Sequence, residues 1–251
     1  MIWVKRSAIA LLALLMVLVI AVAALLYTPA GIKVAVWGAQ KVLPSLSVGG
    51  SQGSLLNGFA LEQLRYRDDN IDLGVAKLAL DIEDSCLLTP AVCISNLAVS
   101  GVRFSMPQLP PVQEDAEEES PSEPLTEISL PIPITLSRLV LDDIELDVLG
   151  NQVSWQHFSS AAEMVGDKLV LKPTDWNKID LTLAPAAEGD AQEVEESNTG
   201  KPEAIVLPEV LIPLSVEIQR FTVEDFTLHG ETPQTVKKLE LVAVADRKSV
   251  V

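Results

Sequence analysis

The chain has 251 residues, enough for one large or two modest domains, and its 35 acidic and 18 basic residues give a formal charge of −17. This charge argues against nucleic-acid binding, which needs clusters of Lys and Arg, and against docking of the soluble part on anionic lipid surfaces. Apolar residues make up 48% of the chain but aromatic residues only 4%, a composition that favours long aliphatic surfaces over compact aromatic cores.

The N-terminus predicts a membrane anchor. Residues 1–6 form a short head with Lys5 and Arg6, and residues 7–28 hold an uncharged apolar run long enough to cross a bilayer. Basic residues beside so short an N-terminus place it in the cytoplasm, so the rest of the chain is expected to be exported. A cleaved signal peptide is the alternative, because 21–23 reads Ala-Val-Ala, a small-residue cleavage pattern. The length of the apolar run favours the uncleaved anchor.

Residues 31–106 are predicted to hold a short helix followed by strands. The helix covers 31–43 and is expected either at the membrane surface or as a cap on the first strands. Short strands are predicted at 46–48 and 71–82, where apolar residues alternate. The glycine-rich stretch 49–54 lacks the Gly-Lys-Ser/Thr of a phosphate-binding loop and is predicted to be a plain turn.

One apolar spacing recurs along the chain, at offsets 0, 3, 5, 8 and 10. Copies begin at positions 56, 94, 136 and 218, with a weaker one at Trp176, Ile179, Leu181 and Ala184; the interval of about 40 residues is typical of repeat proteins. Alternation interrupted by one extra residue predicts two short strands joined by a β-bulge or bend, which keeps the apolar side chains on one face. A pentapeptide-type β-helix also steps by five, but it needs uninterrupted coils.

The predicted bends are Glu62-Gln63, Ser100-Gly101, Asp142-Asp143 and Glu224-Asp225. The predicted apolar face consists of Leu56, Phe59, Leu61, Leu64, Ile94, Leu97, Val99, Val102, Leu136, Leu139, Leu141, Ile144, Leu146, Ile218, Phe221, Val223, Phe226 and Leu228.

The chain has two cysteines, Cys86 and Cys93. So close a pair in an exported chain predicts a disulfide, and two buried free thiols are the alternative.

Two acidic, proline-rich linkers, 107–133 and 185–213, separate the β regions 31–106, 134–184 and 214–251. The last region has no closing element, so we expect the chain to be truncated or a fragment.

The sequence offers no catalytic arrangement. Its two histidines, His157 and His229, lie in different segments. Asp143, Glu145 and Asp147 could hold calcium, but alternating carboxylates are more simply the solvent side of a strand. We therefore expect a protein that is not an enzyme and carries no cofactor or metal.

The anchor, the segment LPSLSVGGSQGSLLNGFALEQLRY, the Cys86–Cys93 loop and the segment PITLSRLVLDDIEL together resemble the N-terminal part of the TamB family. These are inner-membrane subunits of the translocation and assembly module, in the AsmA-like group related to bridge-like lipid transfer proteins. The resemblance implies a mostly β fold in which a transmembrane helix precedes an elongated, bent sheet, a "β-taco" with an open hydrophobic groove.

The resemblance also implies phospholipid transport between inner and outer membranes and partnership with TamA, a BamA-like outer-membrane barrel. Family members are far longer, so this chain corresponds to the membrane-proximal entrance of the groove. The alternative function is a scaffold that assists insertion of outer-membrane proteins, such as autotransporters, through pairing of strand edges.

Overall fold

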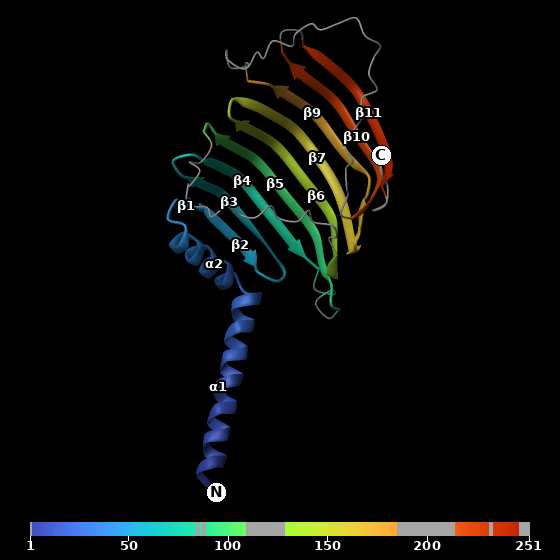
Figure 1. The fold of residues 1–251 in the computed structure, drawn as a ribbon. Helices are drawn as coiled ribbons and strands as arrows, with labels where there is room; N and C mark the ends of the chain where they lie inside the picture. The colour runs from blue at the N-terminus through green and yellow to red at the C-terminus, as the bar shows by residue number, and fades with distance from the viewer. Residues whose placement is uncertain are drawn as a thin grey trace, which may run out of the picture.

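The computed structural model describes residues 2–83, 86, 89–108, 129–184, 214–230 and 233–245. Linker 185–213 and most of linker 107–133 lie outside these residues. The described chain folds into two helices followed by a single mixed sheet of 11 strands (Figure 1). The fold is therefore mostly β with an N-terminal helix, as predicted.

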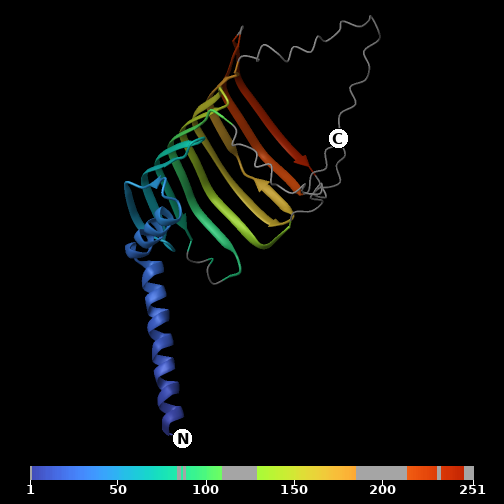
Figure 2. The same cartoon turned by 60° about the vertical axis from the view of Figure 1, so that its left-hand side comes forward.

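The first helix projects away from the sheet, and the second turns sharply against it (Figures 1 and 2). Helix α1 spans Ile2–Tyr27 and α2 spans Pro29–Val42. Among the described residues no single helix is long and apolar enough for a membrane span; Leu11–Tyr27 and Pro29–Val42 qualify only together, as a pair bent by 84°.

The strands follow one another across the sheet almost in chain order. They are β1 (Leu46–Ser47), β2 (Gly50–Ser54), β3 (Gly58–Arg67), β4 (Asp72–Ile82), β5 (Val92–Met106), β6 (Leu130–Val148), β7 (Asn151–Gly166), β8 (Lys168–Leu171), β9 (Thr174–Thr182), β10 (Ser215–His229) and β11 (Gln234–Ala245). Strands β1 and β2 both pair with β3, while β8 and β9 together fill the place between β7 and β10.

Most neighbouring strands are antiparallel, as expected for hairpins joined by short turns. Strand β6 runs parallel to β5, and β10 runs parallel to β8 and β9. Parallel neighbours need a long crossover connection, and each of these junctions coincides with one of the two acidic linkers. After each linker the next strand therefore starts at the same end of the sheet as the strand beside it.

Three elements differ from the sequence-based predictions. Residues 50–54 form strand β2 against β3 instead of a plain turn. Strand β7 was not anticipated, because Gln156, His157, Ser159 and Ser160 interrupt its apolar pattern. Strand β6 begins at Leu130 and includes Pro131 and Pro133, so the sheet starts before residue 134.

The predicted bends contain residues in the left-handed conformation. Gln63, Asp143 and Asp225 have φ of 52°, 53° and 55°, and Gly101 has φ of 64°. All four lie seven residues after the first residue of their repeat, at offset 7. The strands run continuously through these bends instead of splitting in two, because one left-handed residue absorbs the phase shift without breaking the ladder.

The sheet is a single layer in the described part of the chain. The main contacts between elements join neighbouring strands, and α2 packs against α1, β1 and β2. Beyond β1 and β2, neither face of the sheet carries a second layer in these contacts, so the side chains of the described strands there must bury one another or meet something else.

Candidate functional site

The repeat spacing places apolar side chains in five rows that cross the sheet from strand to strand. Residues opposite one another in a ladder project on the same side, so each row lies on one face. We call these rows 0, 3, 5, 8 and 10, after the offsets, and together they form the apolar face.

The parallel pair β5–β6 shows the alignment most directly. Ile94, Leu97, Val99, Val102 and Phe104 stand opposite Leu136, Leu139, Leu141, Ile144 and Leu146. The antiparallel strands continue the same rows. Row 5 contains Leu61, Leu78, Val99, Leu141, Phe158, Trp176, Val223 and Leu239, and row 8 contains Leu64, Val75, Val102, Ile144, Trp155, Ile179, Phe226 and Val236.

Row 8 is the most deeply buried row of the apolar face. Val75, Ile144 and Ile179 are 9%, 4% and 3% exposed, although the contacts show no second layer above them. A flat single layer would not bury side chains so far. Because row 8 immediately follows the left-handed residue, we attribute the burial to the bend in each strand.

The opposite face has two buried side chains of its own, Val140 and Thr222, at offset 4 of β6 and β10. Both strands have a register shift just before these residues, between Leu136 and Leu139 in β6 and between Ile218 and Phe221 in β10. Burial on either face of this sheet is thus found next to a strand irregularity.

The weak fifth copy was assigned to the wrong phase. Its residues pair with β10 so that Leu171, Thr174, Trp176, Ile179 and Leu181 occupy offsets 0, 3, 5, 8 and 10. Lys178, with φ of 52°, is its left-handed residue. The true copy starts five residues before Trp176, and Ala184 is not part of it. The polar Thr174 at offset 3 hid the correct phase.

Leu56 was predicted on the apolar face but does not lie on it. It lies in the turn between β2 and β3, outside any strand, and its N–H donates to the Leu26 carbonyl at 3.2 Å. Leu56 therefore joins the sheet to the end of α1. The other predicted residues of the apolar face lie in strands β3, β5, β6 and β10, on the five rows.

Aromatic residues gather on the apolar face between β7 and β10. The Trp176 ring meets Trp155, Phe158 and Phe221 edge to face, with centroid distances of 5.5, 5.9 and 6.4 Å. The indole nitrogens of Trp155 and Trp176 are buried without a hydrogen-bond partner among the described residues. The rows of β3 to β6 are mainly aliphatic, so the apolar face changes character along the sheet.

A hydroxyl pair interrupts row 3 in this aromatic region. The Ser160 and Thr174 oxygens lie 2.8 Å apart, and the Thr174 hydroxyl also donates to the Lys172 carbonyl at 3.0 Å. Thr174 is only 1% exposed. These bonds satisfy polar groups that would otherwise be costly to bury.

The opposite face is polar and holds a cavity of about 1070 Å³. Its lining extends from Ser47 in β1 to His229 in β10 and includes Arg65, Arg103 and Glu145. Arg103 and Glu145 form an exposed cross-strand pair with an Nε–Oε2 distance of 3.2 Å. Sequence reasoning missed this cavity, because its lining follows from strand register instead of from a motif.

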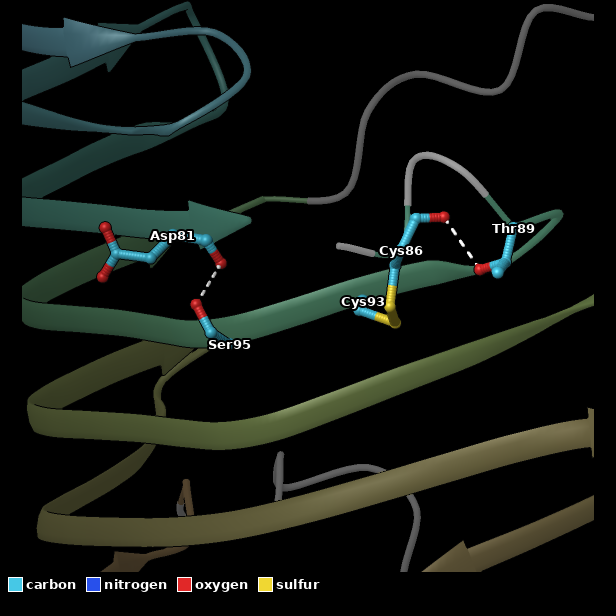
Figure 3. Close-up of a disulfide and its surroundings, with 5 residues drawn as sticks. All are labelled: Asp81, Cys86, Thr89, Cys93 and Ser95. Atoms are coloured by element: carbon cyan, nitrogen blue, oxygen red, sulfur yellow. Dashed lines mark hydrogen bonds between the residues drawn. A yellow bond between two sulfur atoms is a disulfide. The ribbon is translucent and has the colours of Figure 1, made fainter. Parts of the chain in front are cut away.

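The two cysteines form a disulfide at the junction of β4 and β5 (Figure 3), with their Cα atoms 5.8 Å apart. The Thr89 hydroxyl donates to the Cys86 carbonyl at 3.0 Å, and the Ser95 hydroxyl donates to the Asp81 carbonyl at 3.0 Å. The disulfide ties Cys86 to the second residue of β5, Cys93, beside row 0.

Each histidine pairs with an aspartate on a neighbouring strand. His157 Nδ1 lies 2.6 Å from Asp142 Oδ1, and His229 Nε2 lies 2.9 Å from Asp180 Oδ1. Within the described residues, no three His, Cys, Asp or Glu side chains are grouped so as to hold a metal ion. The three carboxylates considered for calcium have different roles. Asp143 is the left-handed residue of its bend, Glu145 pairs with Arg103, and Asp147 accepts a hydrogen bond from the Gly150 N–H.

The geometry defines a class of protein: a repeat-spaced, single-layer β-sheet with one apolar face, joined to an N-terminal helix. The model of the TamB N-terminal domain matches residues 18–251, and the chain therefore belongs to the TamB family. It is 26% identical over 264 residues to the translocation and assembly module subunit TamB of Haemophilus influenzae. The alignment covers 97% of this chain and 20% of that relative, so the chain spans about a fifth of the relative's length. No solved structure matches the chain.

Proposed function

We propose that the chain is the membrane-proximal part of a translocation and assembly module subunit, and that its apolar face carries the acyl chains of phospholipids moving between the inner and outer membranes. Helix α1 anchors it in the inner membrane with the N-terminus in the cytoplasm, and the sheet lies in the periplasm. The protein acts by binding and guiding lipid, not as an enzyme, and needs no cofactor.

The observation that supports this proposal is the single-layer apolar face, whose rows continue from strand to strand and whose row 8 is the most buried. An apolar face must be buried against another element or hold something apolar. The exposed fraction of its side chains falls to 3–9% at Val75, Ile144 and Ile179. On the edge strand β11 the side chains are more exposed, for example Leu239 at 53%. Acyl chains need no polar partner, and aliphatic rows in register offer them the same surface on successive strands.

The anchor is supported by the exposure of α1. The large apolar side chains between Leu11 and Ile20 are 55–70% exposed. Among the described residues, the main contacts of α1 are with α2 and not with the strands. An apolar helix left bare in this way is suited to hydrocarbon.

A pair of arginine substitutions tests the proposal. Leu141→Arg places an unpaired charge on row 5, where it would face acyl chains at a cost of several kcal/mol. Gln156→Arg adds the same charge at an exposed position of β7. We expect the phospholipid phosphorus bound per purified protein to fall several-fold in the first variant and to stay unchanged in the second, with both variants retaining the β-sheet circular dichroism signal. Equal lipid content in the two folded variants would contradict the proposal.

A second candidate function is supported by strand β11. In the described residues β11 pairs only with β10, and Leu241, Val242 and Val244 are 46%, 66% and 76% exposed. An open apolar edge can add a strand of a client protein, as a scaffold for outer-membrane proteins would. Crosslinks from β11 to nascent outer-membrane proteins would favour this function, and lipid recovered with the protein would favour transport. Partnership with TamA is proposed for the longer proteins of which this chain resembles the first part.

A further inference from the structure

The corner between α1 and α2 fixes the direction in which α2 leaves the anchor. Gly31 lies so close to α1 that an ideal Cβ at this residue would be 1.6 Å from the Leu25 carbonyl oxygen. The Leu56 N–H donates to the Leu26 carbonyl at 3.2 Å and so ties the same corner to the β2–β3 turn. Helix α2 therefore has one defined orientation relative to both α1 and the sheet.

Helix α2 has two different faces. Its inner face, with Gly31 and with Ile32 at 3% exposure, packs against α1 and the first strands. Its outer face exposes Lys33, Val34, Trp37 and Lys41, with Trp37 at 62% exposure. Lys41 Nζ lies 5.9 Å from the centre of the Trp37 ring. A tryptophan flanked by lysines on one helix face is typical of helices that lie in the membrane interface.

Charge is strongly segregated between this helix and the rest of the chain. All 35 acidic residues lie at or after Glu62, whereas Lys5, Arg6, Lys33 and Lys41 precede it. Among the salt bridges of the described residues, Lys168, Lys172 and Lys238 each pair with a glutamate, and Lys33 and Lys41 have no carboxylate partner. The two lysines of α2 are thus available to an external anion in an otherwise acidic protein.

We propose that the outer face of α2 lies on the periplasmic surface of the membrane that α1 enters, and that Lys33 and Lys41 bind the headgroups of anionic phospholipids there. The proposal rests on the anchor role given to α1 above. It also orients the molecule, because α2 packs against β1 and β2 and holds this end of the sheet at the membrane surface. A lysine near an anionic surface favours anionic lipid by about fivefold.

Spin labels on the full chain in liposomes of phosphatidylcholine and phosphatidylglycerol test the position of the helix. The native cysteines are joined, so an added cysteine is labelled selectively. We expect a nitroxide at Trp37→Cys to lie at headgroup depth, between one at Leu15→Cys in the hydrocarbon and one at Val242→Cys in water. A label at residue 37 that is as deep as the one at residue 15, or as accessible to water as the one at residue 242, overturns the proposal.

A photo-crosslinker at Val34 tests the preference for charge. We expect the ratio of captured phosphatidylglycerol to captured phosphatidylcholine to exceed the ratio in the bilayer about fivefold or more, and the excess to disappear in Lys33→Gln/Lys41→Gln. The matched control Lys77→Gln/Lys237→Gln, which neutralises two exposed lysines of the sheet, should keep it. Capture in proportion to the bilayer composition overturns the anionic preference.

The two proposals can fail separately. Capture at Val34 without lipid on row 5 leaves the surface helix standing and removes the transport path. Lipid on row 5 together with a water-exposed residue 37 leaves the transport path standing and removes the surface helix.

Discussion

The left-handed bends allow a paired test, because one copy has glycine at this position and another has aspartate. Gly101 has φ of 64° and Asp143 has φ of 53°. A Cβ at Gly101 would lie 2.7 Å from the Ala76 Cβ on the neighbouring strand. The left-handed conformation costs a residue with a side chain about 1–2 kcal/mol, and overpacking adds about 1–3 kcal/mol. We therefore expect Gly101→Ala to lower the free energy of unfolding by about 2–5 kcal/mol.

The reverse change, Asp143→Gly, relieves the left-handed cost but adds freedom to the unfolded chain, so we expect a gain of about 0.5–1 kcal/mol. Urea unfolding of the full chain in detergent, followed by tryptophan fluorescence, measures both variants. Adding Ala76→Gly to Gly101→Ala removes the forced contact and should restore part of the loss. An unchanged midpoint for Gly101→Ala, or a loss of stability in Asp143→Gly, would refute the bend as described.

Three other predictions follow from local contacts. Alkylation of denatured, unreduced protein should leave Cys86 and Cys93 unlabelled, and replacing both by serine should cost about 2–3 kcal/mol in urea unfolding, since the closed loop is short; full labelling without reductant would exclude the disulfide. Gly31→Val should break the α1–α2 corner and speed hydrogen exchange of the Leu56 amide, which would stay protected if the corner did not depend on glycine. Thr174→Val should leave the Ser160 hydroxyl unpaired and cost about 1–3 kcal/mol, with partial recovery on adding Ser160→Ala; no recovery would show that the pair is not the cause.

Much of the fold was predictable because the repeat spacing contains its own geometry. The interval of three residues between Leu141 and Ile144 predicted a bend at Asp143, and the left-handed φ there agrees. The same spacing could not fix the phase of the fifth copy. Its intervals alternate as 3, 2, 3, 2, so a shift by five residues leaves most of the pattern unchanged, and Thr174 at an apolar offset removed the remaining signal.

Features that depend on pairing between distant strands were not predictable. Strand β7 lacks a clear apolar alternation, and its place is set by its partners β6 and β9. The pairing of Arg103 with Glu145 spans 42 residues and exists only because β5 and β6 are parallel. The substitution Glu145→Arg would therefore put a second arginine beside Arg103 and would not be a neutral control for a charge on the apolar face.

The central claim is that lipid lies along the bent apolar face, and photo-crosslinkers placed along β6 test it most directly. Leu141 and Leu146 are five residues apart, so an unbent strand would point them to opposite faces. With the bend at Asp143 they share one face, while Glu145 lies on the other. We predict that crosslinkers at Leu141 and Leu146 both capture phospholipid and that one at Glu145 does not. Capture at Leu141 and Glu145 but not at Leu146, equal capture at all three, or capture at none would contradict the account.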